Sequence, residues 1–165
     1  MINPIVLQPG EGRKLWLVGD QLTIKLDASQ TGGAYSTAVT WTGPGLGPPP
    51  HVHHREDELF YVLEGELSFT YDRQSFNTGP GTAVYLKKGV PHAFANKTAA
   101  PAMFLLIAVP SGFEEFAAEC GTAIDKIPSD IQITPAAIEK LLAVAPKYGI
   151  QVLPDHRAEC ESHPP

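Results

Sequence analysis

The sequence predicts an all-β domain, either a sandwich or a barrel, followed by two helices. Glycine and proline account for 15 and 16 of the 165 residues, and they separate short runs that are rich in β-branched and aromatic residues. Short strands at such regular spacing are typical of sandwiches and barrels. No helical pattern interrupts the runs in the middle of the chain, which argues against strands that alternate with helices around a parallel sheet.

Each predicted strand is a short run bounded by turn residues. The runs are Lys14–Val18, Leu22–Asp27, Ala34–Thr42, Leu59–Glu64, Leu67–Tyr71, Gln74–Phe76, Ala83–Leu86, His92–Asn96 and Met103–Val109.

Two helices are predicted after the last strand. The first begins at Ser111, where Ser-Gly-Phe-Glu fits a capping box, and Gly121 can end it. The second begins at Thr134, has Pro135 in its first turn and can close at Gly149. Each helix has one apolar face, which we expect to pack on the outside of the sheet. These faces comprise Phe113, Phe116, Ala117 and Cys120 in the first helix, and Ile138, Leu141, Leu142 and Ala145 in the second.

The length fits a single domain over residues 1–165. Its strand-rich core is expected at 34–109 and its helices at 111–149, with a linker at 124–133 and a loose tail at 154–165. The chain is 43% hydrophobic, which is enough to bury a core, and only 18% charged.

The charge of the chain excludes some partners. The net charge is −6 and no basic run occurs, so we expect no nucleic-acid partner. The longest apolar stretch, 102–109, is too short to span a bilayer, and no signal peptide is recognisable. Cys120 and Cys160 form no CxxC motif and are expected to be free thiols. These features predict a cytoplasmic protein without membrane contact.

Three of the six histidines gather in PPPHVHHREDELFYVLEGEL, residues 48–67. In an extended segment His51 and His53 share one face and His54 lies on the other. Glu58 begins the next strand, and it can reach the two histidines if that strand pairs with theirs. Three of these side chains would then be metal ligands.

A fourth ligand is predicted in GTAVYLKKGVPHAFAN, where His92 follows a turn and opens a strand. Three imidazoles and a carboxylate suit one divalent transition-metal ion, and iron, manganese, nickel, cobalt, copper and zinc all accept this set. Structural zinc sites usually include cysteine, which is missing near these residues. The set therefore indicates a metal that works on a substrate rather than one that holds the fold.

Other interpretations of these residues remain open. An isolated HxH pattern also occurs on polar surface strands. Glu56 is a rival to Glu58 as the ligand, although its surroundings, including Arg55 and Asp57, favour solvent. Phe60, Val62 and Phe94 are expected to be core residues and, secondarily, walls of a substrate pocket. Three residues near the C-terminus could bind metal loosely, but a flexible tail is the preferred interpretation. They are His156, Cys160 and His163.

The two histidine segments resemble the two motifs of the cupin superfamily. The first motif has glycine, then His-x-His after five residues, a glutamate after three or four more, and a glycine after another six. In this chain Gly45, His51, His53, Glu58 and Gly65 stand at that spacing.

The second motif has glycine, proline after five residues, then glycine, histidine and asparagine. Here Gly81, Gly89, His92 and Asn96 match, and Lys87 stands where the family has proline. That position shapes a turn and ligates nothing.

The resemblance implies a double-stranded β-helix, or jelly roll, with a single motif pair. All four ligand positions of the family are filled, by His51, His53, Glu58 and His92. Small cupins are commonly homodimers that exchange N-terminal strands, and residues 14–27 are candidates for that role.

Within the superfamily, the tract at 48–67, PSGFEEF and KYGI are similar to small cupins of the quercetin 2,3-dioxygenase-like kind. This implies a metal-dependent dioxygenase that acts on a small flavonol- or enol-type substrate, with Glu58 as ligand and proton acceptor. The alternative is a non-oxygenase cupin, either a metal-dependent isomerase or lyase or a module that binds a small sugar or acid, because one fold supports many reactions.

Overall fold

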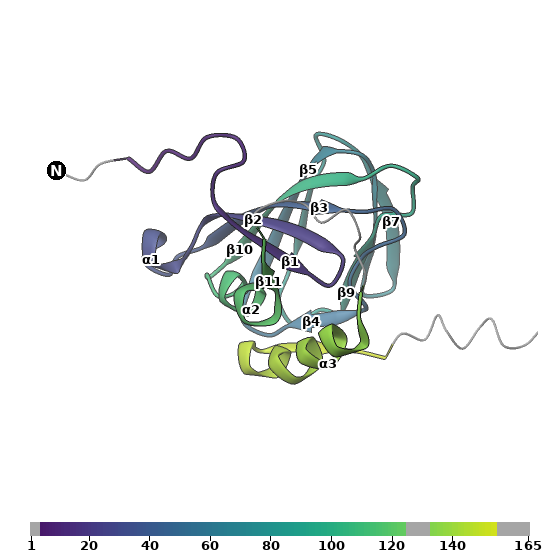
Figure 1. Ribbon diagram of the computed structural model, residues 1–165. Helices are drawn as coiled ribbons and strands as arrows, with labels where there is room; N and C mark the ends of the chain where they lie inside the picture. The colour runs from purple at the N-terminus through teal and green to yellow at the C-terminus, as the bar shows by residue number, and fades with distance from the viewer. Residues whose placement is uncertain (1–3, 125–132, 155–165) are drawn as a thin grey trace, which may run out of the picture.

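Two antiparallel sheets face each other and form the body of the molecule (Figure 1). The computed structural model describes residues 4–124 and 133–154. In that part of the chain, the larger sheet has the strand order β11-β1-β2-β3-β10-β5-β8, and the smaller has the order β12-β4-β9-β6-β7. The predicted all-β jelly roll with two C-terminal helices outside it is therefore confirmed.

The elements have the following bounds. The strands are β1 Arg13–Leu17, β2 Asp20–Leu26, β3 Ser36–Thr42, β4 His51–His53, β5 Asp57–Glu64, β6 Leu67–Tyr71, β7 Gln74–Thr78, β8 Ala83–Leu86, β9 His92–Ala95, β10 Ala102–Val109, β11 Thr122–Ala123 and β12 Ile150–Val152. The helices are α1 Ala28–Thr31, α2 Phe113–Cys120, α3 Pro135–Val144 and the 3₁₀ turn η1 Ala145–Tyr148.

Alternation along the strands decides which side chains meet between the sheets. In β10, which pairs with β3 and β5, Phe104 and Leu106 point inward and are buried. Phe60 from the larger sheet lies 5.2 Å from Phe69 and 5.6 Å from Phe94, both on the smaller sheet, measured between ring centroids. Tilted and edge-on contacts of this kind stabilise a core beyond the area they bury. The aromatic cluster therefore joins the two sheets.

A second core lies between the N-terminal strands and the C-terminal helices. Leu15 and Leu22 from β1 and β2 are each 1% exposed, and they belong to the same buried cluster as Phe116 and Ala117 of α2. Ala145 and Ile150 complete this cluster from the far end of the chain. In Figure 1, α2 lies against β1 and α3 lies beside β4, outside the barrel.

The helix ends differ in part from the prediction. The capping box expected at Ser111 is wrong, because the N-cap of α2 is Gly112, which has no side chain to accept a bond. Glu114 instead accepts hydrogen bonds from the N–H groups of Gly112 and Ala28. The expected cap of α3 is confirmed: the Thr134 side chain accepts from the Ala137 N–H.

The sequence did not predict α1, β11 or β12, which are short elements with weak patterns. The short helix α1 has a capping box of its own, made by Asp27 and Gln30. Most of the expected linker, 124–133, lies outside the described residues. So does nearly all of the expected C-terminal tail, 154–165, including His156, Cys160 and His163. Within residues 4–124 and 133–154, no helix has the length and apolar character needed to cross a membrane.

Candidate metal centre

Two of the histidines face each other on neighbouring strands of the smaller sheet. His51 on β4 and His92 on β9 are register partners, and their ring centroids lie 4.4 Å apart. His53 is two residues from His51 and shares its face, with ring centroids 5.1 Å apart. His54 points the other way and is exposed, as predicted. Alternation along β4 thus selects His51 and His53, and the pairing of β4 with β9 adds His92.

Glu58 reaches the histidines from the opposite sheet. The route we considered, in which the strand of Glu58 pairs with that of the histidines, is not the one used: β5 pairs with β10 and β8, whereas β4 pairs with β9 and β12. The three-residue turn after β4 carries the chain across from one sheet to the other. Glu58 therefore meets the imidazoles across the gap between the sheets, at the edge where the two sheets are joined.

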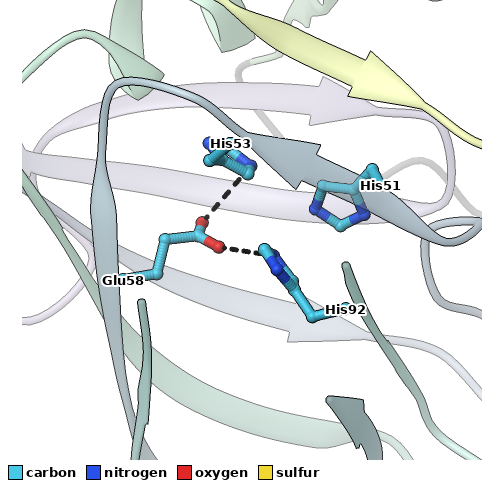
Figure 2. Close-up of side chains that lie close together, drawn as sticks. All are labelled: His51, His53, Glu58 and His92. Carbon is cyan, nitrogen blue, oxygen red and sulfur yellow. Dashed lines mark hydrogen bonds and ion pairs between the residues drawn. The ribbon is translucent and has the colours of Figure 1, made fainter. Parts of the chain in front are cut away.

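The four side chains converge at one point (Figure 2). Glu58 Oε2 lies 3.0 Å from His92 Nε2, and Glu58 Oε1 lies 3.8 Å from His53 Nε2. One donor atom from each of His51, His53, Glu58 and His92 lies within 4.8 Å of all the others. Three of these residues are buried and His51 is partly exposed. The group has the size and the donor types that one divalent ion needs.

Each imidazole is oriented by an acceptor on its outer side. His51 Nδ1 lies 2.9 Å from the Pro49 carbonyl oxygen, and His92 Nδ1 lies 2.9 Å from that of Val90. His53 Nδ1 lies 3.4 Å from Glu56 Oε2. When Nδ1–H donates to these acceptors, a neutral ring keeps its lone pair on Nε2, as a metal ligand requires. The orientation of the three rings is therefore the one expected for metal ligands, and it is not the one expected for core histidines that are held only by hydrogen bonds.

We had expected Glu56 to face solvent, and this is wrong. It is 2% exposed and lies beside His53, on the side away from Glu58. A Cβ atom on residue 112 would lie 2.8 Å from Glu56 Oε1, and Gly112 has a φ of +145°. Glycine at 112 thus leaves room for the buried carboxylate. Glu56 therefore helps to orient His53 and is not part of the converging set. The carboxylate of that set belongs to Glu58.

Neighbouring groups in the site shift the pKa values of Glu58, His51 and His53. Burial alone would raise the pKa of Glu58, but His53 and His92 lower it to about 2, so its carboxylate is ionised. Burial together with the neighbouring His92 and His53 lowers the pKa of His51 to about 3, so this ring is neutral. Burial opposes the charged form of His53, but Glu58 and Glu56 outweigh it and raise the His53 pKa. A cation is thus favoured among these groups, whether it is a proton or a metal.

Two motif residues outside the ligand set have structural roles. Asn96 is fully buried and donates hydrogen bonds to the carbonyl oxygens of Thr42 and Ala100, which fixes the loop after β9. Gly65 has a φ of +71°, and a Cβ there would lie 2.7 Å from the Pro101 carbonyl oxygen. Lys87, which departs from the motif, is exposed in the turn before β9.

A cavity of about 470 Å³ opens next to the ligand set. His51, His53 and Glu58 form one polar part of its wall. Of the three residues that we considered as walls of a substrate pocket, Phe60 and Phe94 line this cavity, whereas the fully buried Val62 is not among its lining residues. Most of the wall is apolar, as in binding sites for small organic molecules.

Several residues that line the cavity were not predicted as pocket residues from the sequence. Phe104 and Leu106 come from β10, and their alternation could have placed them on an inner face without showing that this face borders a cavity. Phe113, Ile138 and Leu142 come from the helices. Leu142 is 48% exposed although it lines the cavity, so α3 covers the opening only in part.

Comparisons with known proteins agree with this geometry. A family described as "Cupin domain" matches residues 41–108. Quercetin 2,3-dioxygenase of Bacillus subtilis is 32% identical over 114 residues, which are 68% of this chain and 33% of that protein. The chain covers between 33% and 48% of the length of the curated relatives it matches.

Solved structures share the fold. KdgF from Halomonas sp. aligns with a TM-score of 0.59 at 15% identity, over 69% of this chain and 99% of that one. A sugar phosphate isomerase of the cupin superfamily from Silicibacter pomeroyi aligns with a TM-score of 0.50 at 26% identity, over 57% of this chain and 61% of that one. With both motifs filled, the jelly-roll fold and these matches, the chain belongs to the cupin superfamily.

Proposed function

We propose that this chain binds one divalent transition-metal ion and acts as a dioxygenase on a small flavonol- or enol-type substrate. The observation that carries the proposal is the convergence of three imidazole nitrogens and one carboxylate beside an apolar cavity. The likeness to a quercetin 2,3-dioxygenase over 114 residues supports the reaction class.

His51, His53, Glu58 and His92 would hold the ion. A bound divalent ion would supply Lewis acidity and a place where the substrate and dioxygen come together. The three imidazoles are neutral as ligands and Glu58 brings one negative charge, so a divalent ion leaves a net positive site. Such a site favours a substrate that binds through a deprotonated hydroxyl group beside a carbonyl.

Glu58 has a second role in this proposal. It is the one carboxylate of the ligand set, and it accepts the proton that the substrate hydroxyl group loses. Its carboxylate is ionised in this structure, so it has the form that can accept a proton.

The cavity wall suits the remainder of such a substrate. Phe60, Phe94 and Phe104 present aromatic surface to it, and these side chains exclude water from the reacting groups. No lysine or arginine occurs among the described lining residues. An uncharged aromatic body therefore fits this wall better than a phosphate group does.

Oxygen consumption tests the proposal. Metal-loaded protein is mixed with a panel of flavonols and enediols, and oxygen uptake is followed with product analysis by mass spectrometry. We expect uptake with at least one flavonol and none with Glu58→Gln. If no compound supports uptake above that of the Glu58→Gln variant with any of the six metals, the dioxygenase proposal is wrong.

A non-oxygenase reaction is the second candidate. It is supported by the likeness to a sugar phosphate isomerase at 26% identity. Tight binding of a sugar or a small acid, without oxygen uptake, would favour this candidate. The absence of cationic side chains from the described part of the cavity wall argues against a phosphorylated sugar.

Association into a homodimer remains a prediction. Residues 14–27, which we expect to take part, fall within β1, β2 and the N-cap of α1. Sedimentation equilibrium would test it, and a mass equal to that of a single chain at micromolar concentration would contradict it.

A further inference from the structure

Two polar side chains line the cavity on the larger sheet without an evident structural partner. Asp20 begins β2 and Thr40 lies on β3, and both belong to the cavity wall. Asp20 Oδ1 and Thr40 Oγ1 are buried, and neither has a hydrogen-bond partner among the described residues. Thr40 as a whole is only 2% exposed.

Strand pairing explains why these two side chains lie on one face. Asp20 is the register partner of Thr42, and Leu22 is the partner of Thr40. Since residues two apart share a face, all four point toward the interior. The Thr42 Oγ1 also has no partner in the described part of the chain. Its hydroxyl group lies close enough to Asp20 to affect the carboxyl group, but the two side chains form no hydrogen bond of good geometry.

Buried polar atoms without partners are costly. Each costs roughly 1–3 kcal/mol of stability, and more than about nine in ten buried polar groups in folded proteins are satisfied. Leucine or valine at these positions would avoid the cost. Polar side chains placed on the wall of a binding cavity are therefore expected to find their partner in a ligand.

The polar pair is well separated from the ligand set. Glu58 stands in register with Ser36 through Ala108, and Thr40 is four residues farther along the same strand. Four residues of β-strand span about 13 Å. One cavity borders both groups, so an elongated molecule can reach them together.

We propose that Asp20 and Thr40 form a second polar subsite, which binds a hydroxyl group at the end of the substrate remote from the metal ligands. The substrate hydroxyl group donates to Asp20 and accepts from Thr40 Oγ1. The inference rests on the proposed function only in assuming that the substrate occupies this cavity.

The protonation behaviour of the Asp20 carboxyl group suits an uncharged ligand. Burial raises the pKa of Asp20 to about 7, and the Thr42 side chain offsets this only in part. No charged side chain of the described residues contributes to the shift. A group of this kind can accept or donate a hydrogen bond near neutral pH, so a hydroxyl group satisfies it in either state.

The first test uses probes that do not depend on the metal reaction. Phenol and toluene are titrated into metal-free protein, and their affinities are measured by NMR. We compare wild type with Thr40→Val, with Asp20→Leu, and with Thr37→Val as the control. Thr37 lies on the same strand, but its side chain points to the outer face. We expect the phenol-to-toluene affinity ratio to fall by about 3- to 10-fold in the two subsite variants and to be unchanged in the control.

Stability measurements without ligand complete the test. Thr40→Val removes an unpartnered buried hydroxyl group, so its melting temperature is expected to equal or exceed that of wild type. A lower melting temperature would show that Thr40 has a structural partner and would overturn the subsite. An unchanged phenol-to-toluene ratio in Thr40→Val would also overturn it, whether or not Asp20→Leu folds.

These outcomes separate the two proposals. If the phenol result is as expected and no flavonol supports oxygen uptake, the subsite stands and the dioxygenase proposal fails. If flavonols are oxidised and the ratio is unaffected by Thr40→Val, the dioxygenase proposal stands and the subsite fails.

Discussion

His51 and His92 lie directly opposite each other on β4 and β9, with ring centroids 4.4 Å apart, although they are far apart in the chain. Their Nδ1 atoms contact carbonyl oxygens, of Pro49 and Val90, each two residues before the histidine. The segment that precedes each strand thus orients the histidine at the start of that strand. The candidate metal site is therefore built from locally oriented groups.

Loss of one imidazole should release the metal. In His92→Ala we expect metal affinity to fall by more than the roughly 10- to 100-fold seen when only a supporting residue is changed. Elemental analysis after dialysis measures the effect. His54→Ala is the matched control, because His54 neighbours the site in sequence and is exposed. Full occupancy in His92→Ala would refute the ligand assignment.

Glu56→Gln should weaken metal binding without changing the ligand set. Its carboxylate lies 3.4 Å from His53 Nδ1 and favours the orientation that turns Nε2 toward the site. We expect affinity to fall by about 10-fold, in line with other residues that support ligands. A competition titration with a chelator measures this. Glu66→Gln, at an exposed position, serves as the control, and equal affinities for both variants would contradict the role of Glu56.

Acidification should release the metal. Histidine ligands must be neutral, and Glu58 and Glu56 raise the pKa of His53, so protons compete for this ring at a higher pH than they would for an ordinary histidine. Metal content is measured after equilibration at a series of pH values, from mildly alkaline to moderately acidic. We expect a steady loss below about pH 6.5, the ordinary pKa of histidine. Constant occupancy over this range would count against histidine ligation.

Asp20→Asn should change how stability depends on pH. The folded-state pKa of Asp20 is about 7, against an ordinary value of 3.8, so the unfolded chain binds fewer protons between these values. The contribution of Asp20 therefore lowers stability as pH rises from about 4 to about 7, by at most about 4 kcal/mol. The Asp20→Asn variant lacks this contribution, so its stability gain over wild type should grow across the range. Urea unfolding at several pH values, with both proteins in the same metal state, tests this. A pH-independent difference would contradict the raised pKa.

Filling the cavity should separate metal binding from substrate binding. Leu106→Trp adds a large side chain to the wall, and overpacking of this kind costs about 1–3 kcal/mol of stability. We expect metal content to stay near that of wild type while flavonol binding, measured by fluorescence titration, is lost. Leu105→Trp is the control, because Leu105 alternates to the outer face of the same strand. Retained flavonol binding in Leu106→Trp would place the substrate elsewhere.

The sequence by itself predicted the strand-rich fold and the residues of the candidate metal site. Turn residues separate the runs, so Leu67–Tyr71 and Ala83–Leu86 were predicted with the bounds they have in the structure. Alternation within a strand is a local property, and it correctly grouped His51 with His53 and excluded His54. Glu58, which begins the next strand, and His92, which opens a strand after a turn, were then added, and the motif spacing agreed with all four residues. Each of these inferences depends on neighbours in the chain.

Only the tertiary structure decided how the elements meet. Glu58 reaches the histidines across the two sheets and not through a paired strand, because β4 and β5 belong to different sheets. Glu56 is buried because Gly112, far along the chain, leaves space for it. The unpartnered Asp20 and Thr40 became recognisable only once the cavity was seen. Burial and cavity shape arise from contacts between distant segments, and local sequence patterns do not contain them.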